Sequence, residues 1–224
     1  MRSIAPITER LPLTVTAWHH KTPPDFVFAA KVPHSITHEK VLIDCEAEFG
    51  EFMETIDILG EKLGPLVFQF PHFDPWKFAK QGDFLAVLTP FLKKLPANHR
   101  FAIEIRNKAW FNAAFANLLR EHTIALVLQD LSFMPRPWEY KEQIDFVTTD
   151  FVYVRWLGDR KGIEEQTTTW DKTVVDRRED LSRWARLFRQ FESRNLKVFA
   201  YANNHYAGNG PGTVKLFWDM WRKP

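Results

Sequence analysis

The feature that most constrains the fold is a repeated alternation between short apolar runs and longer stretches with helical periodicity. Six nearly continuous apolar runs occur, as is typical of strands buried in a parallel sheet. They cover residues 26–31, 66–70, 101–105, 124–129, 151–156 and 198–202. Between them apolar residues recur every three or four positions, and the longest such stripe, 42–63, predicts one helix with Thr37 as its N-cap and Gly64-Pro65 as its end. The sequence therefore predicts an α/β fold with helices covering a parallel sheet.

The ends of these runs favour a β/α barrel over an open doubly wound sheet. Neither G-x-G-x-x-G nor a Walker sequence follows any run, so the usual phosphate loop of the doubly wound fold is missing. In β/α barrels, catalytic groups come from the carboxyl ends of several strands and face one pocket. Each run here ends in polar residues, namely Lys31, Gln69, Glu104 with Arg106, Asp130, Arg155, and Asn203 with Asn204. The alternative interpretation is that strands end in polar residues because they end at solvent.

The segment FAIEIRNKAW, residues 101–110, combines an acid, a base and an aromatic ring. Because side chains alternate along a strand, Glu104 and Arg106 should share one face while the isoleucines point to the other. This arrangement predicts a site on a rigid strand. A structural ion pair at the end of a sheet is the alternative.

Composition restricts the class of protein. The length of 224 residues and the lack of a linker predict a single domain over residues 1–224. Thirty basic and 28 acidic residues give a net charge of +2, which disfavours a general nucleic-acid binder but leaves a local basic cleft open. The single Cys45 excludes an intrachain disulfide and predicts a buried thiol in a reducing compartment. No apolar run is long enough to span a membrane, so we expect a cytoplasmic protein without a membrane partner.

Six motifs, taken in order, resemble those of the YecE-like family, domain of unknown function 72. They are FVFAAKVPHSITHEK, QFP, IEIRNKAW, the strand-ending Asp130, VYVRWLG and FAYANNHYAGNGPGT. The resemblance extends from about Thr14 to the C-terminus and implies an eight-stranded β/α barrel with a pocket at the carboxyl ends of the strands. It implies no reaction, since the family's activity is not established. The family-type positions are Lys31, Thr37, His38, Gln69, Glu104, Arg106, Trp110, Asp130, Arg155, Asn203 and Asn204.

The chain also departs from the family pattern. Members usually begin with a Gly-Thr-Ser-Gly-Trp strand, an aromatic-rich loop and a second strand bearing Val-Glu-x-Asn, and this sequence contains none of them. We therefore expect an incomplete TIM-type barrel with six of eight strands, lacking the first strand-helix unit and the second strand, either because of a downstream start or through natural truncation. The strands at 26–31 and 198–202 would then have open edges, which predicts self-association.

Chemistry suggests a role for each candidate residue. Lys31, Arg106 and Arg155 are expected to clamp an anionic small molecule, a phosphate or carboxylate. Glu104 and Asp130 are the candidate acid/base pair for catalysis. The remaining predicted substrate-binding residues are His38, Gln69, Trp110, Asn203 and Asn204.

Alternatives to this enzyme hypothesis remain. Metal-ligand types occur at His34, His38, His72, Glu104, Asp130 and His205. No zincin-type helix or cysteine pair accompanies them, and His34 and His38 are more typical of a loop and a helix start, so the sequence predicts no metal and identifies no cofactor. A module that binds nucleic acid or a phosphodiester backbone, using the 159–169 loop and the basic helix that follows, is the second hypothesis. A non-catalytic remnant is the third.

Overall fold

The computed structural model describes residues 12–222 and divides the chain into two compact units. The N-terminal unit ends at Ala125, and the C-terminal unit begins at Leu126. In the described residues each unit holds three strands that run parallel to their neighbours, with helices between them. The prediction of an α/β fold with six parallel strands is confirmed. The prediction of one domain over residues 1–224 stays a prediction.

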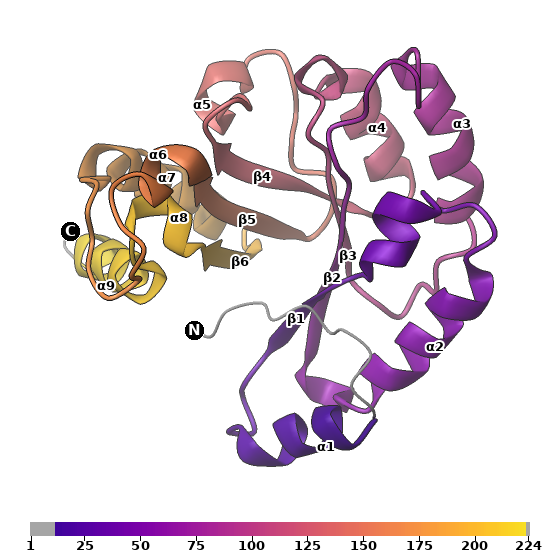
Figure 1. Cartoon of the computed structure of the whole chain (residues 1–224), viewed down its shortest axis with the longest axis horizontal. Helices are drawn as coiled ribbons and strands as arrows, with labels where there is room; N and C mark the ends of the chain where they lie inside the picture. The colour runs from indigo at the N-terminus through magenta and orange to yellow at the C-terminus, as the bar shows by residue number, and fades with distance from the viewer. Residues whose placement is uncertain (1–11, 223–224) are drawn as a thin grey trace. The chain divides into compact units, whose positions relative to one another are not determined.

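The sheet of the N-terminal unit follows chain order. It consists of β1 (Phe28–Lys31), β2 (Leu63–Gln69) and β3 (Phe101–Glu104), with Lys31 opposite Val67 and Gln69 opposite Glu104. Its helical segments are α1 (Pro12–Lys21), the π-helix η1 (Ser35–Glu39), α2 (Glu46–Asp57), η2 (Gly60–Lys62), α3 (Gln81–Leu92), η3 (Lys108–Trp110) and α4 (Ala113–Glu121). Helices α2, α3 and α4 lie along one side of this sheet (Figure 1).

Aromatic packing fixes which face of this sheet is the core face. Phe68 of β2 packs against Phe49 of α2 at 5.9 Å and against Phe91 of α3 at 5.5 Å between ring centroids. Because side chains alternate, the neighbouring Gln69 points to the opposite face, and the register places Lys31 and Glu104 there as well. The helices thus cover one face, and the polar strand ends share the other.

The single helix predicted over 42–63 is wrong. Thr37 lies inside η1 rather than at an N-cap, and α2 begins only at Glu46. Between them Val41 and Leu42 adopt left-handed backbone conformations, with φ of 48° and 66°, and bury their side chains. Burial of these two apolar side chains offsets the cost of leaving the helical conformation.

Gly64 is part of β2 rather than a helix stop. A β-carbon on Gly64 would lie 2.6 Å from the carbonyl oxygen of Phe28, so a residue without a side chain is needed for β1 to approach. Gly64 therefore permits β1 to pair with β2 at this position, although a Gly-Pro dipeptide commonly ends a helix.

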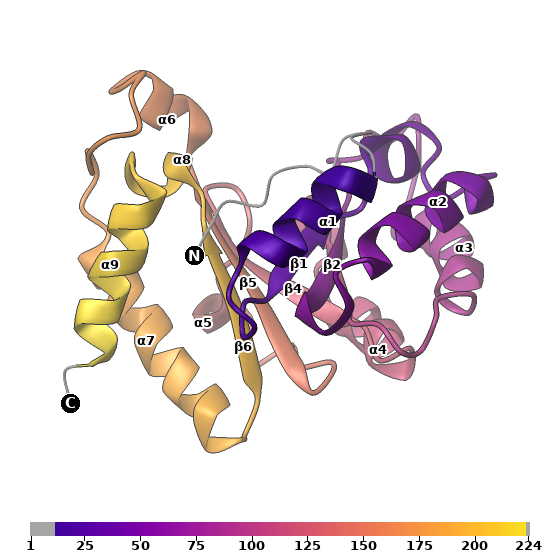
Figure 2. The ribbon, with the colours of Figure 1, turned by 90° about the horizontal axis from the view of Figure 1, so that it is seen from below.

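The C-terminal unit also follows chain order. Its strands are β4 (Ala125–Leu131), β5 (Phe151–Gly158) and β6 (Lys197–Ala202). Its helices are α5 (Pro137–Tyr140), α6 (Arg160–Glu164), α7 (Arg178–Ser193), α8 (Asn204–Ala207) and α9 (Gly210–Trp221). Helices α7 and α9 lie on the same side of β6 (Figure 2). Helix α6 lies within the loop predicted at 159–169, and α8 was not predicted.

The core of this unit is built on Trp156 of β5. Its ring packs against Phe217 of α9 at 5.0 Å and against Trp184 of α7 at 6.3 Å. Asp130 of β4 pairs with Trp156 in the register and so lies on this helix-covered face. Arg155 is opposite Gln129 and Tyr201, which places all three on the other face.

Cys45 is buried, as predicted, although it occupies the N-cap of α2 rather than a position inside a helix. Among residues 12–222, no helix combines the length and apolar character needed to cross a membrane.

Candidate functional site

The N-terminal unit gathers several predicted site residues at the carboxyl ends of its strands. Lys31 ends β1, Gln69 ends β2 and Glu104 ends β3, and the register places them on the face opposite the helices. Arg106 follows two residues after Glu104 on the same face. We call Lys31, His38, Gln69, Glu104 and Arg106 the strand-end cluster.

Glu104 and Arg106 form an ion pair, as the alternation predicted. The carboxylate of Glu104 is fully buried, and its Oε1 accepts hydrogen bonds from Nε of Arg106 at 3.0 Å and from Nη2 at 2.8 Å. The Arg106 side chain is 25% exposed, so the guanidinium reaches the surface. Its Nη1 has no hydrogen-bond partner within residues 12–222, which leaves donor capacity on the outer edge.

His38 projects from η1 toward the same residues. Its Nδ1 lies 2.8 Å from Oγ1 of Thr37, and its Nε2 lies 3.5 Å from Nε2 of Gln69. The ring of His34 stacks on the His38 ring at 4.2 Å between centroids. The imidazole is thus held on three sides by side chains of its own unit.

The surroundings of His38 are electropositive. Burial, which is the largest cause, and then the charges of Lys31, His34 and Arg106 together lower the pKa of His38 to about 4, against an opposing effect of Glu104. An effect of both Lys31 and Arg106 on one imidazole means that the cations at the ends of β1 and β3 act on the same small volume. His38 is therefore neutral at pH 7.

The backbone around η1 is unusual. The π-helix closes with a hydrogen bond from the Lys40 amide to the Ser35 carbonyl, and three non-glycine residues with positive φ follow, at Val41, Leu42 and Asp44. π-Turns and left-handed β-branched residues are costly and concentrate at functional positions. This unusual backbone includes His38 and the residues that follow it.

Trp110 occupies a different environment from the strand-end cluster. Its ring stacks on Phe84 at 5.5 Å and on Phe73 at 6.0 Å, and the residue is buried. Its carbonyl accepts a hydrogen bond from Gln81. Trp110 therefore anchors the segment after β3 in the aromatic core, and its contact with a ligand stays a prediction.

Asp130, in the C-terminal unit, is the centre of a buried hydrogen-bond network. Its Oδ1 accepts from Nε of Arg136 at 2.7 Å, and its Oδ2 accepts from Trp184 Nε1 at 3.0 Å and from the Tyr206 hydroxyl at 2.9 Å. Burial and the neighbouring carboxylate raise the pKa of Tyr206 above its usual range. Asp130 is 1% exposed, and its three hydrogen bonds connect β4 to the segment before α5, to α7 and to α8.

Asp130 and Arg155 do not share a face, contrary to the expectation that all strand-end residues face one pocket. Strand β4 continues to Leu131, so Asp130 is an internal strand residue, and alternation turns it toward the helices. Its partners Arg136, Trp184 and Tyr206 were missed as network residues. Of the three, only Arg136 lies close to Asp130 in sequence, between two prolines in MPRPW. Trp184 and Tyr206 lie 54 and 76 residues away, so no local pattern could have connected them with Asp130.

Asn203 and Asn204 shape the loop after β6. Asn203 is the N-cap of α8, and its Oδ1 accepts hydrogen bonds from the His205 amide at 2.9 Å and from the His205 ring at 2.8 Å. Oδ1 of Asn204 accepts from the Gly210 amide at 2.8 Å. Both side chains therefore position backbone, and the substrate contacts predicted for them and for Arg155 stay predictions.

The metal-ligand types do not gather. No group of three His, Cys, Asp or Glu side chains suited to a metal occurs among residues 12–222. His72 sits on an exposed loop 3.9 Å from Asp74, and His205 contacts Glu164 at 3.1 Å.

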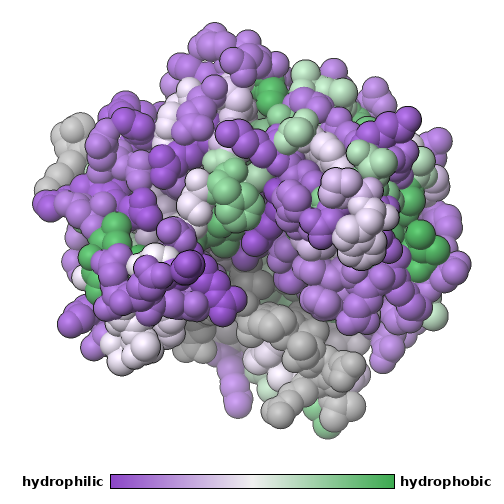
Figure 3. Space-filling model, turned by 45° about the horizontal axis from the view of Figure 1, so that its top comes forward, coloured by the Kyte–Doolittle hydropathy of each residue, from purple (hydrophilic) through white to green (hydrophobic). Residues whose placement is uncertain are grey.

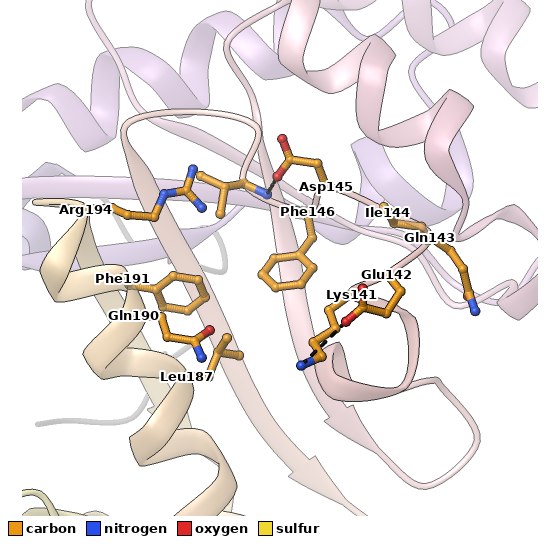
Figure 4. Close-up of a pocket in the computed structure, with 11 residues that line it drawn as sticks. Lys141, Glu142, Gln143, Ile144, Asp145, Phe146, Leu187, Gln190, Phe191 and Arg194 are labelled. Carbon is orange, nitrogen blue, oxygen red and sulfur yellow. Dashed lines mark hydrogen bonds and ion pairs between the residues drawn. The ribbon is translucent and has the colours of Figure 1, made fainter.

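A groove of about 420 Å³ lies in the C-terminal unit, between residues 141–147 and helix α7. Figure 4 shows the rings of Phe146 and Phe191 beside each other at its floor, with Arg194 and Lys141 near its ends. The two rings meet edge to face at 6.2 Å. None of the predicted site residues lines this groove.

Three cations in the N-terminal part of α7 and at its N-cap are engaged in local ion pairs, whereas Arg186 donates to the Ser182 hydroxyl and Arg189 to the Trp221 carbonyl. Arg178 contacts Asp176 at 2.6 Å, Arg183 contacts Glu179 at 2.5 Å and Arg177 contacts Asp180 at 3.4 Å. On the face drawn in Figure 3, hydrophilic residues cover most of the surface and hydrophobic residues form small separate groups. Pairing of this kind weakens the case for α7 as a nucleic-acid surface.

Comparison with known proteins identifies relatives of this chain. Residues 11–224 match the profile of the family described as Protein of unknown function DUF72. UPF0759 protein YecE of Escherichia coli K12 is 30% identical over 101 residues, which cover 45% of this chain and 35% of that protein. The matched segment thus spans about a third of the length of this curated relative.

Two solved structures of DUF72 family proteins are similar in fold. The protein from Thermotoga maritima MSB8 superposes with a TM-score of 0.72 at 24% identity, over 97% of this chain and 82% of that one. The protein from Enterococcus faecalis V583 superposes with a TM-score of 0.63 at 20% identity, over 98% and 84%.

Proposed function

The chain belongs to DUF72, a family of proteins of unknown function, and we propose from its own residues that it is an enzyme acting on an anionic small molecule. The ligand carries a phosphate or carboxylate that lies between Lys31 and Arg106. The proposed setting is the pocket of a TIM-type β/α barrel, whose carboxyl-end face carries such sites.

One observation carries this proposal. Lys31, at the end of β1, and Arg106, after β3, lie on the same face of the sheet beside His38 and both lower the pKa of its imidazole, although they are 75 residues apart in sequence. An ammonium and a guanidinium on one face can both bind a phosphate or carboxylate, the ammonium as a point charge and the guanidinium as a planar donor. The guanidinium also retains Nη1 for a second hydrogen bond beside its pair with Glu104.

The acid/base role is assigned to Glu104, because it lies beside the proposed anion clamp. The same role for Asp130 stays a prediction, and its three hydrogen bonds favour a positioning role instead. Arg155, Asn203 and Asn204 stay predicted substrate-binding residues, and a cytoplasmic location stays a prediction from the lone cysteine.

Calorimetric titration with inorganic phosphate tests the proposal. We expect the wild-type chain to bind phosphate and Lys31→Met to bind it at least tenfold more weakly, because one of the two cations is lost. Lys77→Met removes an exposed lysine of the same unit and should leave the affinity unchanged. Equal affinity of the Lys31→Met variant and the wild type would refute the anion site.

A further inference from the structure

The hydrogen bonds of Thr37 determine which nitrogen of His38 carries the proton. The Thr37 hydroxyl lies 3.1 Å from the carbonyl oxygen of Pro33, which is only an acceptor, so the single hydroxyl hydrogen is donated there. The Thr37 oxygen can then only accept from Nδ1 of His38, at 2.8 Å. A neutral His38 therefore carries its hydrogen on Nδ1 and a lone pair on Nε2.

The lone pair on Nε2 faces the strand-end cluster. Its neighbour there is Nε2 of Gln69 at 3.5 Å, a long contact. The same amide nitrogen donates at 2.9 Å to the carbonyl of Phe70, which also fixes the orientation of the amide group. Nε2 of His38 is thus a hydrogen-bond acceptor with only a weak donor in contact.

We propose that Nε2 of His38 accepts a hydrogen bond from a hydroxyl group of the ligand, so that the site takes anions that also carry a hydroxyl. This inference rests on the proposed function, because the anionic group is placed between Lys31 and Arg106. A hydroxylated phosphate or hydroxy acid presents both groups within a few bonds of each other. Simple anions lack the donor that Nε2 requires.

The charges around His38 keep this acceptor in place. The groups that face it are Lys31, His34, Arg106 and Glu104, and their combined effect together with burial holds the pKa of His38 at about 4. Protonation of Nε2 would convert the acceptor into a donor, and at neutral pH this does not occur. The hydrogen bond to Thr37 and the stacked ring of His34 hold the imidazole in the same position.

The experiment compares two phosphates of similar size, glycerol 3-phosphate and propyl phosphate, by calorimetry at pH 7. The wild-type chain should bind glycerol 3-phosphate about five- to tenfold more tightly, the contribution of one hydrogen bond. His38→Phe keeps a ring but removes the acceptor, and it should bind both phosphates equally. His72→Phe, on an exposed loop of the same unit, should retain the preference.

The outcomes separate this inference from the proposed function. Equal binding of both phosphates by the wild-type chain would overturn the inference and leave the anion site intact. Failure of both phosphates to bind would overturn the proposed function and the inference with it. A second measurement needs no variant, since nitrogen-15 NMR distinguishes the two imidazole tautomers. A hydrogen on Nε2 of His38 in the free protein would also overturn the inference.

Discussion

Arg106 directs two donors at a single oxygen of Glu104, with Nε at 3.0 Å and Nη2 at 2.8 Å from Oε1. The carboxylate is fully buried, whereas the guanidinium is 25% exposed. The pair thus presents its positive partner outward and its negative partner inward. The buried carboxylate therefore fixes the orientation of the Arg106 guanidinium.

Replacement of Arg106 by Met should lower the free energy of unfolding by about 3 kcal/mol, because the buried Glu104 loses its cation. Chemical denaturation measures this change. The double variant Glu104→Gln/Arg106→Met should recover part of the loss. Arg178→Met breaks an exposed pair with Asp176 and should cost less than about 1 kcal/mol. If Arg106→Met and Arg178→Met lower the free energy of unfolding by similar amounts, burial does not make the Glu104–Arg106 pair more stabilising than an exposed pair.

Asp130→Asn should destabilise the protein by about 2–4 kcal/mol. The Asp130 carboxylate accepts hydrogen bonds from Arg136, Trp184 and Tyr206. The NH2 group of an asparagine is a donor, so it would face at least one of these donors and leave that donor without an acceptor. Asp219→Asn, an exposed position in the same unit, is the matched control and should change the free energy of unfolding little. A thermal melt of Asp130→Asn that coincides with the wild-type melt would contradict the network.

His38 makes stability depend on pH. Its pKa is about 4 in the folded chain and near the ordinary value of 6.5 in the unfolded chain, so the unfolded chain binds more protons between these values. The free energy of unfolding should therefore fall as the pH decreases from about 6.5 to about 4. With allowance for solvent screening, His38 should contribute about 1–2 kcal/mol of this fall.

Denaturant unfolding at several pH values checks this dependence. His38→Phe should remove that contribution, whereas His72→Phe should not. Parallel pH profiles for the wild-type chain and His38→Phe would show that His38 keeps its ordinary protonation on folding.

The sequence predicted the strands and their polar ends well because apolar runs and alternation are local signals. Lys31, Gln69, Glu104 and Arg106 share a face for this reason. The turn around His38 was not predictable, since the left-handed Val41 and Leu42 are stabilised by burial that only the folded unit provides. The position of Asp130 was mistaken because β4 extends one residue beyond it, which made an internal strand residue look terminal.

Self-association through open strand edges remains a prediction from the departure from the family pattern. Residues 26–31 and 198–202 are rich in Phe, Val and Ala, and β1 and β6 stand at the two ends of the strand order. We expect the sedimentation coefficient of the 224-residue chain to rise with protein concentration. A single monomeric species at every concentration would argue against open edges.

The most direct test of the anion site is the pKa of His38, measured by proton NMR with and without inorganic phosphate at matched ionic strength. A phosphate between Lys31 and Arg106 adds negative charge beside the imidazole, so the pKa of His38 should rise from about 4 toward its ordinary value. The His72 resonances should show no comparable change. A His38 titration curve that phosphate leaves unmoved would contradict the account.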